Sequence, residues 1–121
     1  MSSLASREAL LQRLREANDV NITVSGRKSK KKRSAPVWFV VDGRTVKLVP
    51  MKGTDTPWFK NLVEDHQIGL GVGGTTVTLK ATIKKDPKET ERVLGLFRTK
   101  YRSMWSESYY PKRDVLVEVP V

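Results

Sequence analysis

The densest chemistry in the sequence is a cluster of positive charge near the end of its first quarter. Residues 25–36 read Ser-Gly-Arg-Lys-Ser-Lys-Lys-Lys-Arg-Ser-Ala-Pro, with six cations in the seven positions 27–33. Without these six charges the formal net charge falls from +10 to +4, so much of the chain's basicity is local. Arg and Lys supply charge to an anion, while serine hydroxyls and free backbone N–H groups supply directed hydrogen bonds.

A solvated hairpin tip or a nuclear-localisation-like patch is the ordinary interpretation of such a run. Two features favour phosphate binding instead. Gly26 and Ser29 permit close approach of the backbone to an anion, and Pro36 fixes the start of the strand that follows. We therefore predict that the loop binds a phosphate or another acidic group through Arg27, Lys28 and Arg33.

Two weaker candidates follow along the chain. Lys52 and Lys60 could form a second cationic wall beside the N-terminus of a short helix, although Trp58 and Leu62 at i,i+4 spacing also suit an ordinary core helix. Tyr109 and Tyr110 precede Pro111 in an expected loop and could line an aromatic pocket. Tyr101 is the third candidate for substrate contact, although a tyrosine on an amphipathic helix more often belongs to the core.

Composition limits the classes of protein and of site. A chain of 121 residues is expected to form one domain, residues 1–121. The absence of Cys excludes disulfides and thiolate metal sites, and a single histidine, His66, makes an all-protein metal site unfavourable. No apolar run reaches the ~18 residues needed to cross a bilayer. We therefore expect a cytoplasmic protein with an anionic partner.

The hydrophobic pattern predicts an α+β fold. Asp42-Gly43 and Gly73-Gly74 each separate two β-rich runs, as in hairpins. Asp86-Pro87 is typical of a helix start. Helices are expected over residues 3–18, 57–65 (with Thr56 as its cap) and 87–105, and six strands over 20–24, 37–41, 45–49, 68–72, 77–83 and 115–119. Without βαβ alternation, this order favours a small closed barrel or a strongly curled antiparallel sheet with helices outside it.

Several of these motifs together resemble the flavin/deazaflavin-binding split β-barrel superfamily, which includes pyridoxamine-phosphate oxidases, and most closely its deazaflavin-dependent nitroreductase group. That group has a Gly-Arg/Lys-Lys-Ser-Gly loop leading to Arg-x-x-Pro, and a Trp-(Tyr/Phe)-x-Asn-Leu helix after a Gly-containing loop. The matching segments, in order, are Gly26–Ser29, Arg33–Pro36, Lys52-Gly53, Trp58–Leu62 and Phe97–Tyr101. Lys30 departs from the pattern at the group's second Gly, and Pro50-Met51 replaces a small polar residue.

The resemblance implies a six-stranded antiparallel split β-barrel with flanking helices, a homodimer, and hydride transfer from a bound cofactor to a small electrophilic acceptor such as a quinone, nitro compound or enone. The implied cofactor is the deazaflavin coenzyme F-420, or alternatively FMN, with its ring near Ala35–Val37 and Val49–Lys52. The residues implied to bind it are Arg27, Lys28, Ser29, Arg33, Ser34, Ala35, Pro36, Val49, Pro50, Met51, Lys52, Gly53, Trp58, Lys60 and Asn61.

Two alternatives remain open from the residues. A basic nucleic-acid-binding barrel would use the loop on phosphates and Trp38, Phe39 or Trp58 for base stacking. Because the cations cluster in one loop, we favour a small-molecule partner over nucleic acid. A cofactor-binding barrel without catalysis, such as a scavenger or sensor, has the same sequence features as an enzyme.

Overall fold

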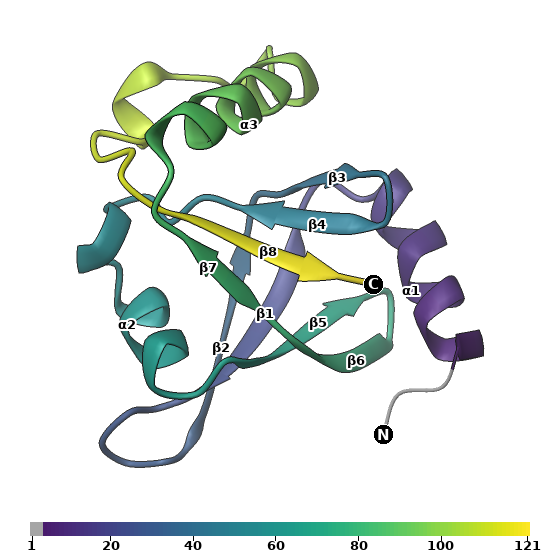
Figure 1. Cartoon of the computed structure of the whole chain (residues 1–121). Coiled ribbons are helices and arrows are strands. Elements are labelled where there is room, and N and C mark those ends of the chain that lie inside the picture. The colour runs from purple at the N-terminus through teal and green to yellow at the C-terminus, as the bar shows by residue number, and fades with distance from the viewer. Residues whose placement is uncertain (1–3) are drawn as a thin grey trace.

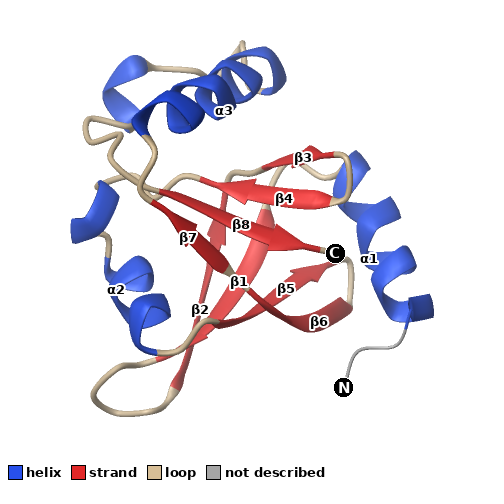
Figure 2. Ribbon diagram, viewed as in Figure 1, coloured by secondary structure: helices blue, strands red, loops and turns tan. Residues whose placement is uncertain are grey.

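Two antiparallel sheets and three flanking helices make up the computed structural model, which describes residues 4–121 (Figures 1 and 2). The helices are α1 (Leu4–Glu16), α2 (Pro57–Glu64) and α3 (Pro87–Lys100), with short 3-10 helices η1 (Gly53–Asp55) and η2 (Glu107–Tyr109). The strands are β1 (Val20–Ser25), β2 (Lys32–Val37), β3 (Val40–Asp42), β4 (Thr45–Leu48), β5 (Gln67–Val72), β6 (Thr75–Lys80), β7 (Thr82–Lys84) and β8 (Leu116–Pro120).

The sheets have the strand orders β2-β1-β5-β6 and β3-β4-β8-β7, and every pair of neighbouring strands is antiparallel. Figure 1 shows α3 over the second sheet, α1 along the side of β5 and β6, and α2 beside the first sheet. The loop between β1 and β2 projects away from the rest of the molecule. The predicted α+β class and antiparallel pairing are therefore confirmed.

The prediction of six strands is wrong: the described residues form eight. The expected strand 37–41 is divided between β2 and β3, and the expected strand 77–83 between β6 and β7, so each run passes from one sheet to the other. At the first break, the amide of Phe39 donates to Tyr101 Oη (3.1 Å) and its carbonyl accepts from Lys100 Nζ (2.9 Å). At the second, the Ala81 amide donates to the His66 carbonyl. Partners from elsewhere in the fold thus satisfy the backbone where each ladder stops.

Three element boundaries also differ from expectation. The basic run is only partly a loop, because β2 already begins at Lys32 and pairs there with Ser25. Helix α3 ends at Lys100 rather than 105, with Tyr101 as its C-cap. Helix α1 ends two residues early, at Glu16, and residue 3 of the predicted helix lies outside the described residues.

The turns and caps largely follow the sequence. Gly43 has φ +65°, and Gly73 and Gly74 have φ +57° and +84°, so both predicted hairpin turns use the left-handed backbone that glycine tolerates. Asp86 caps α3 by accepting the Glu89 amide at 3.1 Å. Thr56 stands at the N-cap position of α2, but its hydroxyl instead accepts the Lys52 amide at 2.9 Å.

Two apolar clusters hold the fold together. The larger fills the space between the sheets and includes Ile22, Leu48 and Val117. The smaller lies under α3 and includes Leu94, Phe97 and Leu116. Neighbouring β8 residues Leu116 and Val117 belong to different clusters because successive side chains of a strand point to opposite faces.

Candidate functional site

A cavity of about 570 Å³ lies where the end of β2, the segment around η1 and the loop after α3 meet. Its volume is within the usual range for small-molecule sites. Most of its lining is apolar or aromatic, with Lys52 and Asp19 as its charged residues. The lining residues are Asp19, Ala35, Pro36, Val37, Trp38, Val49, Met51, Lys52, Thr56, Pro57, Trp58, Tyr109 and Tyr110.

Trp38 forms an aromatic wall of this cavity. Its indole stacks on the Tyr101 ring at a centroid distance of 4.1 Å and an interplanar angle of 7°. Tyr109 meets it edge-on, with centroids 5.7 Å apart. Stacked and edge-on pairs are favourable arrangements for aromatic rings and restrict how each ring can turn. The wall is therefore a rigid, flat surface.

Tyr101, one of the three predicted substrate-contacting tyrosines, has a different place. It is 1% exposed and belongs to the cluster under α3, and it does not line the cavity. Its hydroxyl accepts the Phe39 amide at 3.1 Å and faces the carbonyls of Asn18 (2.5 Å) and Phe39 (3.0 Å). Burial raises the pKa of Tyr101 to about 12. This hydroxyl thus joins the end of α3 to the segments that contain Asn18 and Phe39. It does not reach the cavity in which a substrate would bind.

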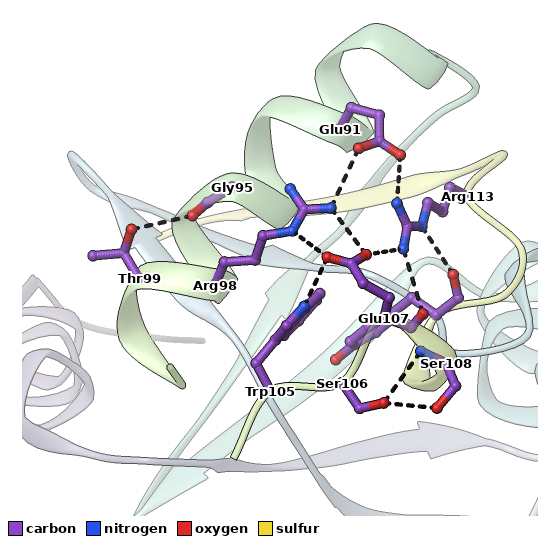
Figure 3. A network of polar contacts seen from close by, with 10 residues as sticks. Glu91, Gly95, Arg98, Thr99, Trp105, Ser106, Glu107, Ser108 and Arg113 are labelled. Carbon is purple, nitrogen blue, oxygen red and sulfur yellow. Dashed lines mark hydrogen bonds and ion pairs between the residues drawn. The ribbon is translucent and has the colours of Figure 1, made fainter. Parts of the chain in front are cut away.

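The loop that carries Tyr109 and Tyr110 is held by a network of charged side chains (Figure 3). At its centre, the Glu107 carboxylate accepts hydrogen bonds from Arg98 Nε (2.7 Å), Trp105 Nε1 (2.9 Å) and Arg113 Nη2 (2.5 Å). Hydrogen bonding, from Arg98 first, holds the pKa of Glu107 well below its usual range. Glu91 on α3 binds Arg113 at 2.9 Å, so both ends of the loop are tied to the helix.

The basic loop is a tight connection between β1 and β2. The Gly26 amide donates to the Lys31 carbonyl (2.8 Å) and the Lys30 amide to the Gly26 carbonyl (2.9 Å). Lys30 has φ +62°, the left-handed region that favours glycine. This is the position at which the sequence departs from the Gly of the resembled motif. A Cβ at Gly26 would lie 2.8 Å from Ser29 Oγ, so only glycine fits there without a shift.

Asn61 joins this loop to α2. Its Oδ1 accepts hydrogen bonds from the Arg27 amide (3.2 Å) and from Arg27 Nη1 (2.8 Å). Asn61 is 5% exposed, so this oxygen is largely occupied by the protein itself. The arginine keeps further N–H donors for another partner. Two residues that the resemblance implied as cofactor-binding are therefore in contact with each other.

The structure brings together only part of the predicted set. Ala35, Pro36, Val49, Met51, Lys52, Trp58, Tyr109 and Tyr110 line the cavity, whereas Arg27, Lys28, Ser29, Arg33, Ser34, Pro50, Gly53, Lys60 and Asn61 do not. Arg33 and Trp38 are five residues apart along and just beyond β2, or about 17 Å in an extended strand. Only an elongated ligand could reach from the aromatic wall to the cationic loop.

Sequence reasoning did not assign Asp19, Thr56 or Pro57 to the pocket, and considered Trp38 only for base stacking. Trp38 could have been predicted as a lining residue from the sequence, because it directly follows the Ala35–Val37 segment that was expected to contact the cofactor ring. No local signal marks Asp19, which reaches the cavity because β1 starts at Val20, opposite Val37.

Lys100 lies beside Phe39, the residue that follows the cavity-lining Trp38. Its Nζ is 3.5 Å from the Phe39 ring centroid, and burial lowers its pKa to about 8.

The base-stacking set of the nucleic-acid alternative is not exposed as that alternative requires. Phe39 is 0% exposed, and Trp38 and Trp58 are half-buried and face the cavity. Among residues 4–121, no group of three or more His, Asp or Glu side chains is placed to hold a metal ion. Within the same residues, no helix has the length and apolar character needed to cross a membrane.

Comparison with known proteins identifies relatives at two levels. The profile of the family described as "Uncharacterized protein conserved in bacteria (DUF2255)" matches residues 10–114. No curated protein matches the sequence. Three solved structures that share the fold are an F420-H2 dependent reductase, a domain-swapped dimer, and a Listeria innocua protein assigned as a pyridoxamine 5′-phosphate oxidase.

The agreement in fold with these structures covers most of each chain. The reductase is 21% identical, with a TM-score of 0.64, over 84% of this chain and 93% of its own. The domain-swapped dimer is 20% identical, with a TM-score of 0.65, over 95% and 93%. The Listeria protein is 13% identical, with a TM-score of 0.64, over 93% and 90%. At these identities the likeness shows the fold alone, and it confirms the expected split β-barrel.

Proposed function

This chain belongs to the DUF2255 family of proteins conserved in bacteria, and we propose that it is an oxidoreductase that binds a deazaflavin coenzyme and passes a hydride to a small electrophilic acceptor. The observation that carries the proposal is the path from the aromatic cavity along β2 to the six cations of the β1–β2 loop and the start of β2. A ligand suited to that path has a flat, weakly polar end and an anionic end about 17 Å away.

The residues present fit such a cofactor. Trp38, Trp58 and Tyr109 offer flat surfaces for a ring system, and the cavity volume of about 570 Å³ can hold one. Arg27, Lys28 and Arg33 would hold the phosphate or acidic tail through charge-assisted hydrogen bonds. The reduced cofactor, when bound, supplies the hydride, and the protein supplies orientation and a partly water-excluded cavity.

Tyr109 is the side chain best placed to contact the acceptor. It is 42% exposed, lies at the cavity wall, and its hydroxyl makes no hydrogen bond with the described residues. It could therefore hydrogen-bond the acceptor or donate a proton to the reduced product. Tyr110 is 3% exposed and stacks on Trp105, so its role is to shape the wall.

FMN is the alternative cofactor, since the same fold occurs in a protein assigned as a pyridoxamine 5′-phosphate oxidase. We further propose that the chain acts as one domain, residues 1–121, and pairs as a homodimer, an arrangement supported by the domain-swapped dimer of the same fold.

The test is a titration of the purified protein with oxidised and reduced deazaflavin coenzyme beside FMN, followed by cofactor absorbance and fluorescence. The Arg27→Ala/Arg33→Ala double variant should bind the preferred cofactor at least tenfold more weakly, since each charged hydrogen bond is worth roughly 1.5–3 kcal/mol. Lys85→Ala/Lys88→Ala removes the same charge just before α3 and in its first turn, and is the matched control. Failure to bind any of these cofactors, or equal affinity in both double variants, would contradict the proposal.

A further inference from the structure

Asp19 is the acidic residue among the cavity-lining side chains, and no side chain of the described residues is bound directly to it. It lies in the connection between α1 and β1, directly before Val20. Among the described residues its carboxylate makes no hydrogen bond and no ion pair. The other acidic side chains around the aromatic loop, Glu91 and Glu107, are by contrast bound by arginines.

The backbone next to Asp19 is held in place by the buried Tyr101 side chain. The Tyr101 hydroxyl contacts the carbonyl of Asn18, the residue before Asp19, at 2.5 Å. The same tyrosine stacks under the Trp38 ring. The Tyr101 side chain, at the C-cap of α3, therefore contacts both the flat wall and the loop that carries the Asp19 carboxylate.

The charge of Asp19 is opposite in sign to the net charge of the protein. The formal net charge is +10, so the long-range field of the molecule attracts anions. The nearby Lys100 Nζ donates to the Phe39 carbonyl at 2.9 Å and attracts Asp19 from a distance, without a direct ion pair, so a ligand cation would add the direct contact that Lys100 does not make. Lys52 is the other charged residue of the lining. A cation at the aromatic end would consequently be bound by local contacts with Asp19 and the Trp38 ring.

We propose that Asp19 makes the aromatic end of the cavity a site for a small planar molecule that carries a cationic or N–H-donating group. If the proposed function holds, on which this step rests, that molecule is the hydride acceptor. The acceptor class is then narrowed to flat electrophiles with an amine, amidine or similar nitrogen donor. Quinones and nitro compounds that lack such a donor would bind less well.

Benzamidine, benzamide and benzoate are suitable probes because they share one planar frame and carry charges of +1, 0 and −1. Binding is followed by quenching of tryptophan fluorescence, since Trp38 and Trp58 both line the cavity. We expect the wild-type protein to bind benzamidine about tenfold more tightly than benzamide, the ratio that one charged hydrogen bond supplies. Benzoate should show no such gain, despite the positive net charge.

Asp19→Asn should remove the benzamidine preference and leave benzamide affinity unchanged. Glu16→Gln changes the net charge by the same amount at an exposed position of α1 and should retain the preference. Lys52→Gln should retain it as well. Thermal melts of each variant establish that the fold is kept.

Equal binding of the three probes by the wild-type protein would overturn the inference, and so would an unchanged preference in Asp19→Asn or an equal loss in Glu16→Gln. The cofactor titration is carried out on the same samples. A benzamidine preference that depends on Asp19 in a protein that binds no cofactor would refute the proposed function but not the cation site. Cofactor binding without that preference would refute the site alone.

Discussion

At the scale of single residues, Tyr101 connects distant parts of the chain through one buried hydroxyl. Its one hydroxyl serves the amide and carbonyl of Phe39 and the carbonyl of Asn18, more than sixty positions away along the chain. A residue that looks catalytic from its type thus has a structural task. It fixes the bend between β2 and β3 and, through Asn18, the approach to β1.

Replacing Tyr101 by Phe tests this task. The variant keeps the ring stack on Trp38 but leaves the buried Phe39 amide without an acceptor, so the free energy of unfolding should fall by about 1–3 kcal/mol. Urea unfolding measures the change. Tyr109→Phe is the matched control, because that hydroxyl has no partner among the described residues, and its effect should stay within about 0.5 kcal/mol. Equal effects of the two substitutions would rule out the role given to the Tyr101 hydroxyl.

At the scale of elements, the sequence predicted what local chemistry decides and missed what distant partners decide. Both hairpin turns and the capped start of α3 were predicted correctly because glycine, an aspartate cap and proline act within a few residues. The breaks at Phe39 and Ala81 were missed, since their backbone groups are satisfied by Tyr101, Lys100 and His66 from other elements. The same limit applies to the cavity: Trp58 belonged to a motif, but Asp19 reaches it only through strand pairing.

The β1–β2 loop carries a backbone cost that can be tested. Lys30 has φ +62°, which is unfavourable for a residue with a Cβ by roughly 1–2 kcal/mol. Lys30→Gly should therefore raise the free energy of unfolding, by up to about 1 kcal/mol after the added freedom of the unfolded chain is subtracted. Lys31→Gly removes the same charge where φ is not positive and should be destabilising. If both variants shift the urea midpoint in the same direction, the effect is one of charge and not of backbone.

The η2 loop depends on Glu107, and its stability should therefore depend on pH. The folded-state pKa of this carboxyl is lowered, so its stabilising effect is complete above the usual value of 4.5 and is lost as the pH falls below it. Glu107→Gln should weaken the loop at neutral pH and remove that part of the acid sensitivity. Hydrogen exchange of the amides of residues 106–110 measures the first effect, and unfolding between pH 3 and 7 the second. Glu64→Gln, at an exposed site on α2, should change neither.

At the scale of the whole molecule, the cationic cluster and the aromatic cavity lie at opposite ends of β2. Four of the six clustered cations lie on the β1–β2 loop, which projects away from the rest of the molecule (Figure 1), and the other two lie at the start of β2. The aromatic cavity lies at the other end of β2. Several ion pairs, such as Lys47 with Glu118 and Arg92 with Asp42, lie on the second sheet and α3. Positive charge is thus densest along the sequence at one end of the elongated site, where it would attract the anionic end of a ligand before contact.

This arrangement predicts how cofactor affinity depends on salt. Exposed charges are screened beyond about 10 Å at 0.1 M ionic strength, so the part of the affinity that comes from loop lysines without direct contacts should disappear as salt rises. Lys30→Gln/Lys31→Gln should weaken cofactor binding at 20 mM NaCl and converge on the wild-type affinity at 500 mM, because it removes only the screened contribution. Lys85→Gln/Lys88→Gln removes equal charge away from the loop and should follow the wild-type curve throughout. Arg27→Ala/Arg33→Ala should remain weaker at every salt concentration, since short charged hydrogen bonds are screened far less than distant charges. If the affinities of the three double variants fall in parallel as salt rises, only net charge matters. That result would contradict the distinction between arginines that contact the cofactor and lysines that attract it from a distance.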